Sequence, residues 1–107
     1  MNYSIIATPQ FAKSVKKLSK KYKLIKNDLI LLQDELQSSI DGVELGNSCY
    51  KIRVANSSIP TGKRGGFRVV YYKKIKNIIY LLEIYTKSEL ENISDDKILQ
   101  ILKENNL

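Results

Sequence analysis

Residues 49–85 read CYKIRVANSSIPTGKRGGFRVVYYKKIKNIIYLLEIY, and this stretch decides the fold. Its apolar residues fall into three runs with the composition that is typical of strands. The expected strands are 49–55, 67–74 and 78–85. Turn-forming residues fill 56–66, which predicts a loop, and a tight turn near Lys76-Asn77 joins the last two runs. The stretch therefore predicts the centre of a mainly antiparallel sheet.

One more strand and two helices are expected before this stretch. The apolar run 3–7 predicts a first strand. Thr8 then supplies a helix N-cap and Pro9 fits the first helical position, so we expect a helix over 9–21. A second amphipathic helix fits 24–38, and the short connection between the two makes them an antiparallel hairpin.

The remaining segments complete an α+β domain. We expect a loop from Asp41 to Ser48, and Ser94 caps a C-terminal helix that carries acidic side chains in its first turn. The predicted order is β-α-α-β-β-β-α, with the helices packed on one face of the sheet. A chain of 107 residues can build one modest core, so we expect a single domain over 1–107.

The charge balance of the chain is basic. Lys and Arg total 18 against 11 Asp and Glu, and the formal net charge of +7 suggests a polyanionic partner or an acidic protein that neutralises the surface. A basic balance can also reflect genome composition alone. The apolar runs are far shorter than the ~20 residues of a membrane span, and the N-terminus lacks the architecture of a signal peptide. We therefore expect a cytoplasmic protein without a membrane partner.

The composition excludes several kinds of chemistry. The sequence has no His and a single cysteine, Cys49, so an internal disulfide is impossible. A zinc site would have only Cys49 and carboxylates as ligands, which is an implausible set for zinc. We therefore expect no metal and no cofactor. Cys49 is expected to be a buried apolar side chain, because no His is present to activate it as a nucleophile.

Between residues 49 and 82 the chain carries eight Lys or Arg residues and no Asp or Glu. Alternation with a period of two places Lys51 and Arg53 on one face of their strand, and Arg68 on one face of the next. If the two strands pair antiparallel, these three cations form one surface that attracts polyphosphate, so nucleic acid is the first partner to consider. The alternative is that they only solvate the open face of a half-covered sheet.

The span CYKIRVANSSIPTGKRGGFRVVYYKKIKNIIYLLEIYTKSELENIS resembles the RelE/ParE superfamily of bacterial toxin–antitoxin toxins, and it is most similar to the HigB/RelE side. The features that carry the resemblance are a Y-K-I-R strand, a G-G-F-R-V-V-Y-Y strand after a variable loop, and an I-Y-L-L-E-I-Y-T-K-S-E strand. The upstream strand and two helices agree as well, so the resemblance covers nearly the whole chain. It implies a small microbial-RNase-like fold that enters the ribosomal A site and cuts mRNA there without a metal.

The resemblance also implies a set of catalytic residues. Lys51 and Arg53 match the basic pair on the second strand of the RelE branch, and Arg68 matches the arginine on its third strand. Lys87 matches a basic residue just after the last strand. These positions imply that basic side chains on the concave face of the sheet carry the reaction.

Two positions depart from the pattern of the family. A further arginine and a tyrosine of some RelE members fall near Ser88 and Ser94 in this sequence. Their chemistry is therefore absent, weaker, or supplied by Tyr85 or Tyr72, because a phenol can donate a proton. The departures affect the choice of acid and base more than the class of activity.

Cleavage of RNA through its own 2′-OH needs a base, charge stabilisation at phosphorus and an acid for the leaving oxygen. Arg and Lys readily supply the charge stabilisation. Lys51 is one candidate base, because the neighbouring cations Arg53 and Arg68 favour the neutral amine. Glu44 in the preceding loop is another, although an exposed loop carboxylate often has no role. Glu83 is expected to make a cross-strand ion pair.

Further contacts with RNA are expected from other residues. Lys63 and Arg64 lie in the 56–66 loop and can contact backbone phosphate, and Tyr72 can stack on a base. A second basic patch lies on the first helix, where it can grip ribosomal RNA or only solvate that face. The lysines of this patch are Lys13, Lys16, Lys17 and Lys20.

The sequence therefore predicts a ribosome-dependent mRNA endoribonuclease that acts as the toxin of a toxin–antitoxin pair. The expected partners are the ribosome, mRNA and a cognate antitoxin that is acidic where it lies over the basic face. Two alternatives stay open: a ParE-like protein that inhibits DNA gyrase by protein–protein binding, and a degenerate member that binds RNA or antitoxin without cleaving. The cluster of Lys51, Arg53 and Arg68 favours the nuclease, since the ParE branch does not need it.

Overall fold

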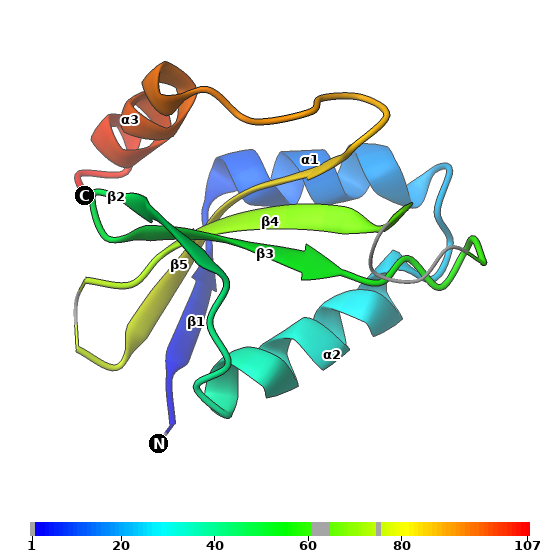
Figure 1. The fold of residues 1–107 in the computed structure, drawn as a ribbon, viewed down its shortest axis with the longest axis horizontal. Coiled ribbons are helices and arrows are strands. Elements are labelled where there is room, and N and C mark those ends of the chain that lie inside the picture. Colours follow the sequence, from blue (N-terminus) through cyan, green and yellow to red (C-terminus); the bar gives the residue numbers. More distant parts are fainter. Residues whose placement is uncertain (1, 61–64, 75) are drawn as a thin grey trace.

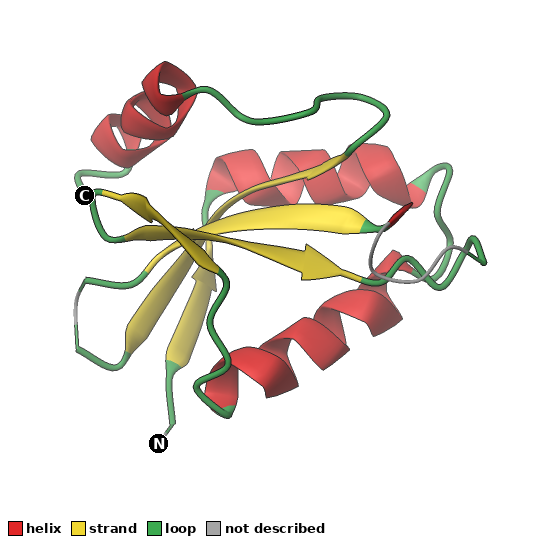
Figure 2. Ribbon diagram, viewed as in Figure 1, coloured by secondary structure: helices red, strands yellow, loops and turns green. Residues whose placement is uncertain are grey.

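The computed structural model describes residues 2–60, 65–74 and 76–107, and it confirms the expected α+β class (Figures 1 and 2). The elements are β1 Ser4–Ala7, α1 Pro9–Ser19, α2 Ile25–Gln37, β2 Val43–Gly46, β3 Cys49–Val54, β4 Phe67–Tyr72, β5 Ile78–Thr86 and α3 Asp95–Glu104. Within the described ranges, no helix is long and apolar enough to cross a membrane.

The five strands form one sheet in the order β1-β5-β4-β3-β2. β1 runs parallel to β5, and each of the other neighbouring pairs is antiparallel, so the sheet is mainly antiparallel as expected. β4 is the middle strand and has β3 on one side and β5 on the other. The three strands from the stretch 49–85 therefore form the centre of the sheet.

The expected starts of two helices are confirmed by their caps. Thr8 Oγ1 accepts a hydrogen bond from the N–H of Phe11 at 3.2 Å, and Pro9 occupies the first position of α1. Ser94 Oγ accepts from the N–H of Lys97 at 3.1 Å at the start of α3. Figure 1 shows α1 and α2 running in roughly opposite directions, as expected for a helical hairpin.

A strand that was not expected, β2, occupies much of the predicted loop before Ser48. β2 pairs antiparallel with β3 across a tight turn in which Asn47 and Ser48 have φ of 53° and 61°. Turns with two such residues match the twist of a β-hairpin, and Asn tolerates this left-handed conformation. The strand escapes prediction because it is four residues long and mostly exposed, so it shows no alternation of apolar and polar residues.

Apolar clusters lie on both faces of the sheet, which corrects the expectation that all helices pack on one face. On one face, Phe11 of α1 and Leu32 of α2 pack in a cluster with Val69. On the other face, Ile101 of α3 packs in a cluster with Val70. The physical reason is that β4 carries apolar residues in both alternating sets, so both of its faces need cover from water.

A polar network fixes the connection between α2 and β2 onto the sheet. The hydroxyl of Tyr71, a fully buried residue, donates to Asp41 Oδ1 and accepts from the N–H of Gly42, both at 2.9 Å. Lys73 Nζ donates to both carboxylate oxygens of Asp41 at 3.1 Å and lies 4.7 Å from the centre of the Tyr3 ring. Burial raises the pKa of Tyr71 above its usual range, so the phenol keeps its proton and remains a donor.

We expect Tyr71→Phe to lower the free energy of unfolding by about 1–3 kcal/mol, because it removes the acceptor for Gly42 and a donor to Asp41. Urea unfolding at neutral pH measures the difference. Tyr50→Phe is the matched control, since the Tyr50 ring stacks on that of Tyr71 at 5.4 Å and its substitution should stay within about 0.5 kcal/mol of wild type. Equal stability of wild type and Tyr71→Phe would contradict a stabilising role for the network.

Candidate functional site

Three side chains form a row across the middle of the sheet. Arg53 of β3 pairs with Arg68 of β4, and Arg68 pairs with Tyr85 of β5. Lys51 lies two residues before Arg53 and pairs with Val70, whose side chain belongs to the cluster under α3. The structure therefore confirms that Lys51, Arg53 and Arg68 share one face, and this is the face that α3 covers in part.

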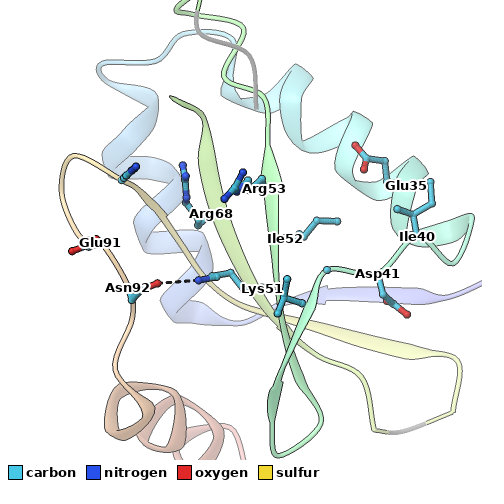
Figure 3. Close-up of a pocket in the computed structure, with 12 residues that line it drawn as sticks. Glu35, Ile40, Asp41, Lys51, Ile52, Arg53, Arg68, Glu91 and Asn92 are labelled. Carbon is cyan, nitrogen blue, oxygen red and sulfur yellow. Dashed lines mark hydrogen bonds between the residues drawn. The ribbon is translucent and has the colours of Figure 1, made fainter. Parts of the chain in front are cut away.

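A cavity of about 660 Å³ opens beside this row (Figure 3). Its lining comes from β3 and β4, from α2 and the connection that follows it, and from the segment between β5 and α3. In Figure 3 the side chains of Arg53 and Arg68 point to the same side of the sheet. The cations that line the cavity are Lys51, Arg53, Arg68 and Lys87. The fold thus gathers four of the five expected catalytic residues around one space.

Lys51 and Arg53 approach the cavity from β3. Arg53 is exposed, whereas Lys51 is half-buried and its Nζ donates a hydrogen bond to Asn92 Oδ1 at 2.9 Å. The connection after α2 lies directly against the backbone of Lys51, since a Cβ on Gly42 would meet the Lys51 carbonyl oxygen at 2.1 Å. Glycine is therefore required where this wall of the cavity meets β3.

Arg68 is buried, with 6% of its surface exposed, so it does not lie on an open face as the sequence suggested. The reason is its place on the middle strand, where Arg53 and Tyr85 flank it on either side. Its Nη1 donates to the carbonyl oxygen of Gly66 at 3.0 Å. Because a guanidinium keeps its charge in proteins and little water screens it here, Arg68 is a fixed positive charge at the base of the cavity.

Tyr85 is buried beside Arg68, with 5% of its surface exposed. Within the described part of the chain, its hydroxyl has no partner at hydrogen-bonding geometry. Burial raises the pKa of Tyr85, while the nearby N–H of Ile93 and the charge of Arg68 act in the opposite direction and are outweighed. The phenol therefore keeps its proton at neutral pH and can donate it to an acceptor that reaches it.

Three carboxylates and one amide line the cavity without any signal in the sequence. They are Glu35, Asp41, Glu91 and Asn92. Asp41 is engaged by Lys73 and Tyr71 in the network described above. The four residues come from α2, from the connection after it and from the segment after β5, so only the folded chain brings them together.

The two carboxylates that the sequence did suggest lie elsewhere. Glu44 is exposed on β2 and is not among the residues that line the cavity. Glu83 has Val70 as its cross-strand neighbour, and its carboxylate accepts hydrogen bonds from Ser14 Oγ of α1 and from the N–H of Ile84. The expected cross-strand ion pair of Glu83 is therefore wrong, because the neighbouring position is apolar and the side chain turns to α1.

Of the other residues expected to bind RNA, those that the structure describes do not line this cavity. Tyr72 is buried in the cluster under α3 and lines a second cavity near the C-terminal end of that helix. α1 packs on the opposite face of the sheet, and the lysines of its second basic patch are exposed: Lys13, Lys16 and Lys17 on the helix and Lys20 just after it. Lys63 and Arg64 lie outside the described residues.

Ser88 and Ser94 have local structural contacts. Ser88 Oγ lies 3.1 Å from Thr86 Oγ1, and Ser94 caps α3. Cys49 is fully buried as expected, and burial raises the pKa of its thiol to about 11, which keeps it protonated. In the described ranges, no three His, Cys, Asp or Glu side chains gather where they would hold a metal ion.

Comparisons with known proteins bear on the family and the fold of the chain. The sequence model of the RelE family, described as the RelE toxin of the RelE/RelB toxin–antitoxin system, matches residues 10–105. Among solved structures, the chain is similar to the E. coli toxin RelE, determined as a double arginine-to-alanine mutant in the free state. The TM-score is 0.60 at 16% sequence identity, over 97% of this chain and 98% of that chain, which supports the fold.

We expect Tyr85→Phe to leave the free energy of unfolding unchanged or to raise it by up to about 1 kcal/mol. The substitution removes a buried hydroxyl that lacks a partner and keeps the packing of the ring. Urea unfolding of this variant and of Tyr71→Phe measures the difference, because the hydroxyl of Tyr71 makes two hydrogen bonds. A loss as large as that of Tyr71→Phe would mean that the hydroxyl of Tyr85 is bonded in the folded protein.

Proposed function

Because the chain belongs to the RelE family of toxins from toxin–antitoxin systems, we propose that it is a ribosome-dependent endoribonuclease that cuts mRNA and thereby inhibits translation. The observation that carries the proposal is the row of Arg53, Arg68 and Tyr85 beside a cavity that Lys51 and Lys87 also line. This arrangement suits a phosphodiester, because cations surround the phosphate and a protonated phenol lies next to them.

The proposed reaction is attack of the RNA's own 2′-oxygen on the adjacent phosphorus. A base takes the 2′-OH proton as the new O–P bond forms, and an acid protonates the 5′-oxygen as its bond to phosphorus breaks. Arg53 and Arg68 stabilise the extra negative charge on the phosphorane through paired N–H contacts. Lys51 is the proposed base, Tyr85 the proposed acid, and Lys87 contacts a phosphate of the bound strand.

The ribosome is proposed to position the mRNA for this reaction. The chain has no His, and a lysine base is weak near neutral pH, so alignment of the reacting atoms must supply much of the acceleration. Positioning alone contributes up to roughly 7–11 kcal/mol. The exposed lysines of α1 lie on the opposite face of the sheet and are proposed to contact ribosomal RNA while mRNA occupies the cavity.

The proposed protein partner is an antitoxin, as the toxin–antitoxin family of the chain implies. Four cations and three carboxylates line the cavity, one of the carboxylates, Asp41, is bound by Lys73, and the whole chain carries a net charge of +7. An acidic segment of the antitoxin is therefore the complement that this surface favours, because opposite potentials speed association and fix register. Such a segment would occupy the space that the RNA phosphates need.

Expression of this chain alone is expected to arrest growth by stopping protein synthesis before DNA synthesis. Pulse labelling with an amino acid and with thymidine, sampled from the first minutes after induction, measures the order of the two effects. Early loss of DNA synthesis with translation intact would instead support a ParE-like inhibitor of DNA gyrase. Cleavage of mRNA on purified ribosomes, compared with naked RNA at the same salt concentration, then tests whether the ribosome is required.

Arg53→Ala is expected to lower ribosome-dependent cleavage by about 10²–10³-fold, because it removes a contact to the charge that develops at phosphorus. Arg53 is exposed, so stability should change by no more than about 0.5 kcal/mol. Lys74→Ala, which removes an exposed charge just after β4 and outside the cavity, is the control and should keep full activity. Full activity of Arg53→Ala would place the reaction on another surface.

A further inference from the structure

Asn92 is an exposed residue at the cavity, and its side chain contacts Lys51. Its Oδ1 accepts a hydrogen bond from Lys51 Nζ at 2.9 Å and so links the segment after β5 to β3 (Figure 3). From this contact we propose that Asn92 is a positioning residue for Lys51 in RNA cleavage, an inference that rests on the proposed function. Asn92 orients the amine toward the substrate without placing a negative charge beside it.

The backbone on both sides of Asn92 is anchored, so its amide has a defined place. Ile93 is buried in the cluster under α3, and Ser94 begins that helix. On the other side, Thr86 Oγ1 donates to Glu89 Oε1 at 3.0 Å, and the N–H of Glu89 donates to the Thr86 carbonyl oxygen at 3.1 Å. The amide that meets Lys51 is therefore carried by a segment fixed at two points.

The chemistry of the partner distinguishes Lys51 from Lys73. Lys73 pairs with the carboxylate of Asp41, and although burial lowers its pKa, the bonds to Asp41 and Tyr3 outweigh burial and raise it. A carboxylate partner thus keeps a lysine protonated. An amide oxygen accepts one N–H of a lysine without adding a negative charge, so it lacks the electrostatic preference for the ammonium form that a carboxylate adds.

Asn92→Ala is expected to lower the rate of single-turnover cleavage on the ribosome about tenfold. The Lys51 side chain would regain its rotamer freedom, and the entropy cost of ordering it again in the transition state is of that order. Ribosome binding should be unchanged and the melting temperature should stay within about 3 °C. Asn27→Ala, an exposed position on α2, is the control and should cleave like wild type. A fall in melting temperature that accounts for the lost activity would make Asn92 structural and overturn the proposal.

Asn92→Asp keeps the size and the acceptor but adds a negative charge beside Lys51. We expect its activity to fall further at neutral pH and to recover at higher pH, because a carboxylate favours the protonated amine. The other charged groups that share the cavity with Lys51 are Glu35, Asp41, Arg53, Arg68, Lys87 and Glu91, and they are the same in every variant. A pH profile identical to that of Asn92→Ala would contradict the assigned role.

The decisive comparison is made in a Lys51→Ala background. There Asn92→Ala should have no further effect on cleavage, because no amine remains to be positioned. A second tenfold loss would show that Asn92 acts on its own and would overturn the inference. If the wild type cleaves no RNA, the proposed function fails. The contact between Asn92 and Lys51 is then tested by NMR of the Lys51 ammonium, which measures how fast its protons exchange with water. Equal exchange rates in wild type and Asn92→Ala would show that the contact is absent in solution.

Discussion

Every residue of β4 is buried, and one of them is an arginine. Apolar side chains in both alternating sets of this middle strand require α1 and α2 on one face of the sheet and α3 on the other. A guanidinium keeps its charge in proteins, and burying a charge completely under apolar side chains is costly. The apolar side chains that pack on this face therefore end at Arg68, and the cavity lies beside Arg68. A single charge in an apolar strand thus decides where the candidate site is.

Alternation along the strands was enough to place Lys51, Arg53 and Arg68 on one face, because a strand offers each side chain only two directions. Alternation does not tell how deeply a side chain is buried, because burial depends on the order of the strands in the sheet. The burial of Arg68 and Tyr85 was therefore not foreseen. The contact between Asn92 and Lys51 was also not foreseen. The segment of Asn92 has no period, and the contact joins residues that are 41 positions apart.

The candidate site contains features that do not favour stability. The hydroxyl of Tyr85 is buried and meets no group among the described residues at hydrogen-bonding geometry, and Arg68 is a charge that is almost wholly withdrawn from water. Burial of each group costs stability, and such costs are expected where function outweighs stability. Tyr71 shows the contrast: on the other face of the same sheet, its hydroxyl is fully bonded and serves the fold.

The first strand of the chain finds its partner in the last. β1 pairs Ser4 with Ile78 and Ala7 with Leu81, and Thr8 donates to the Leu81 carbonyl oxygen from its N–H at 3.0 Å and its hydroxyl at 2.8 Å. None of these contacts can form during synthesis until β5 has left the ribosome, and β5 also supplies the last member of the arginine–tyrosine row. A nascent chain therefore has neither a closed sheet nor an assembled cavity. A toxin of the proposed kind would spare the ribosome that makes it until β5 has been synthesised and released from it.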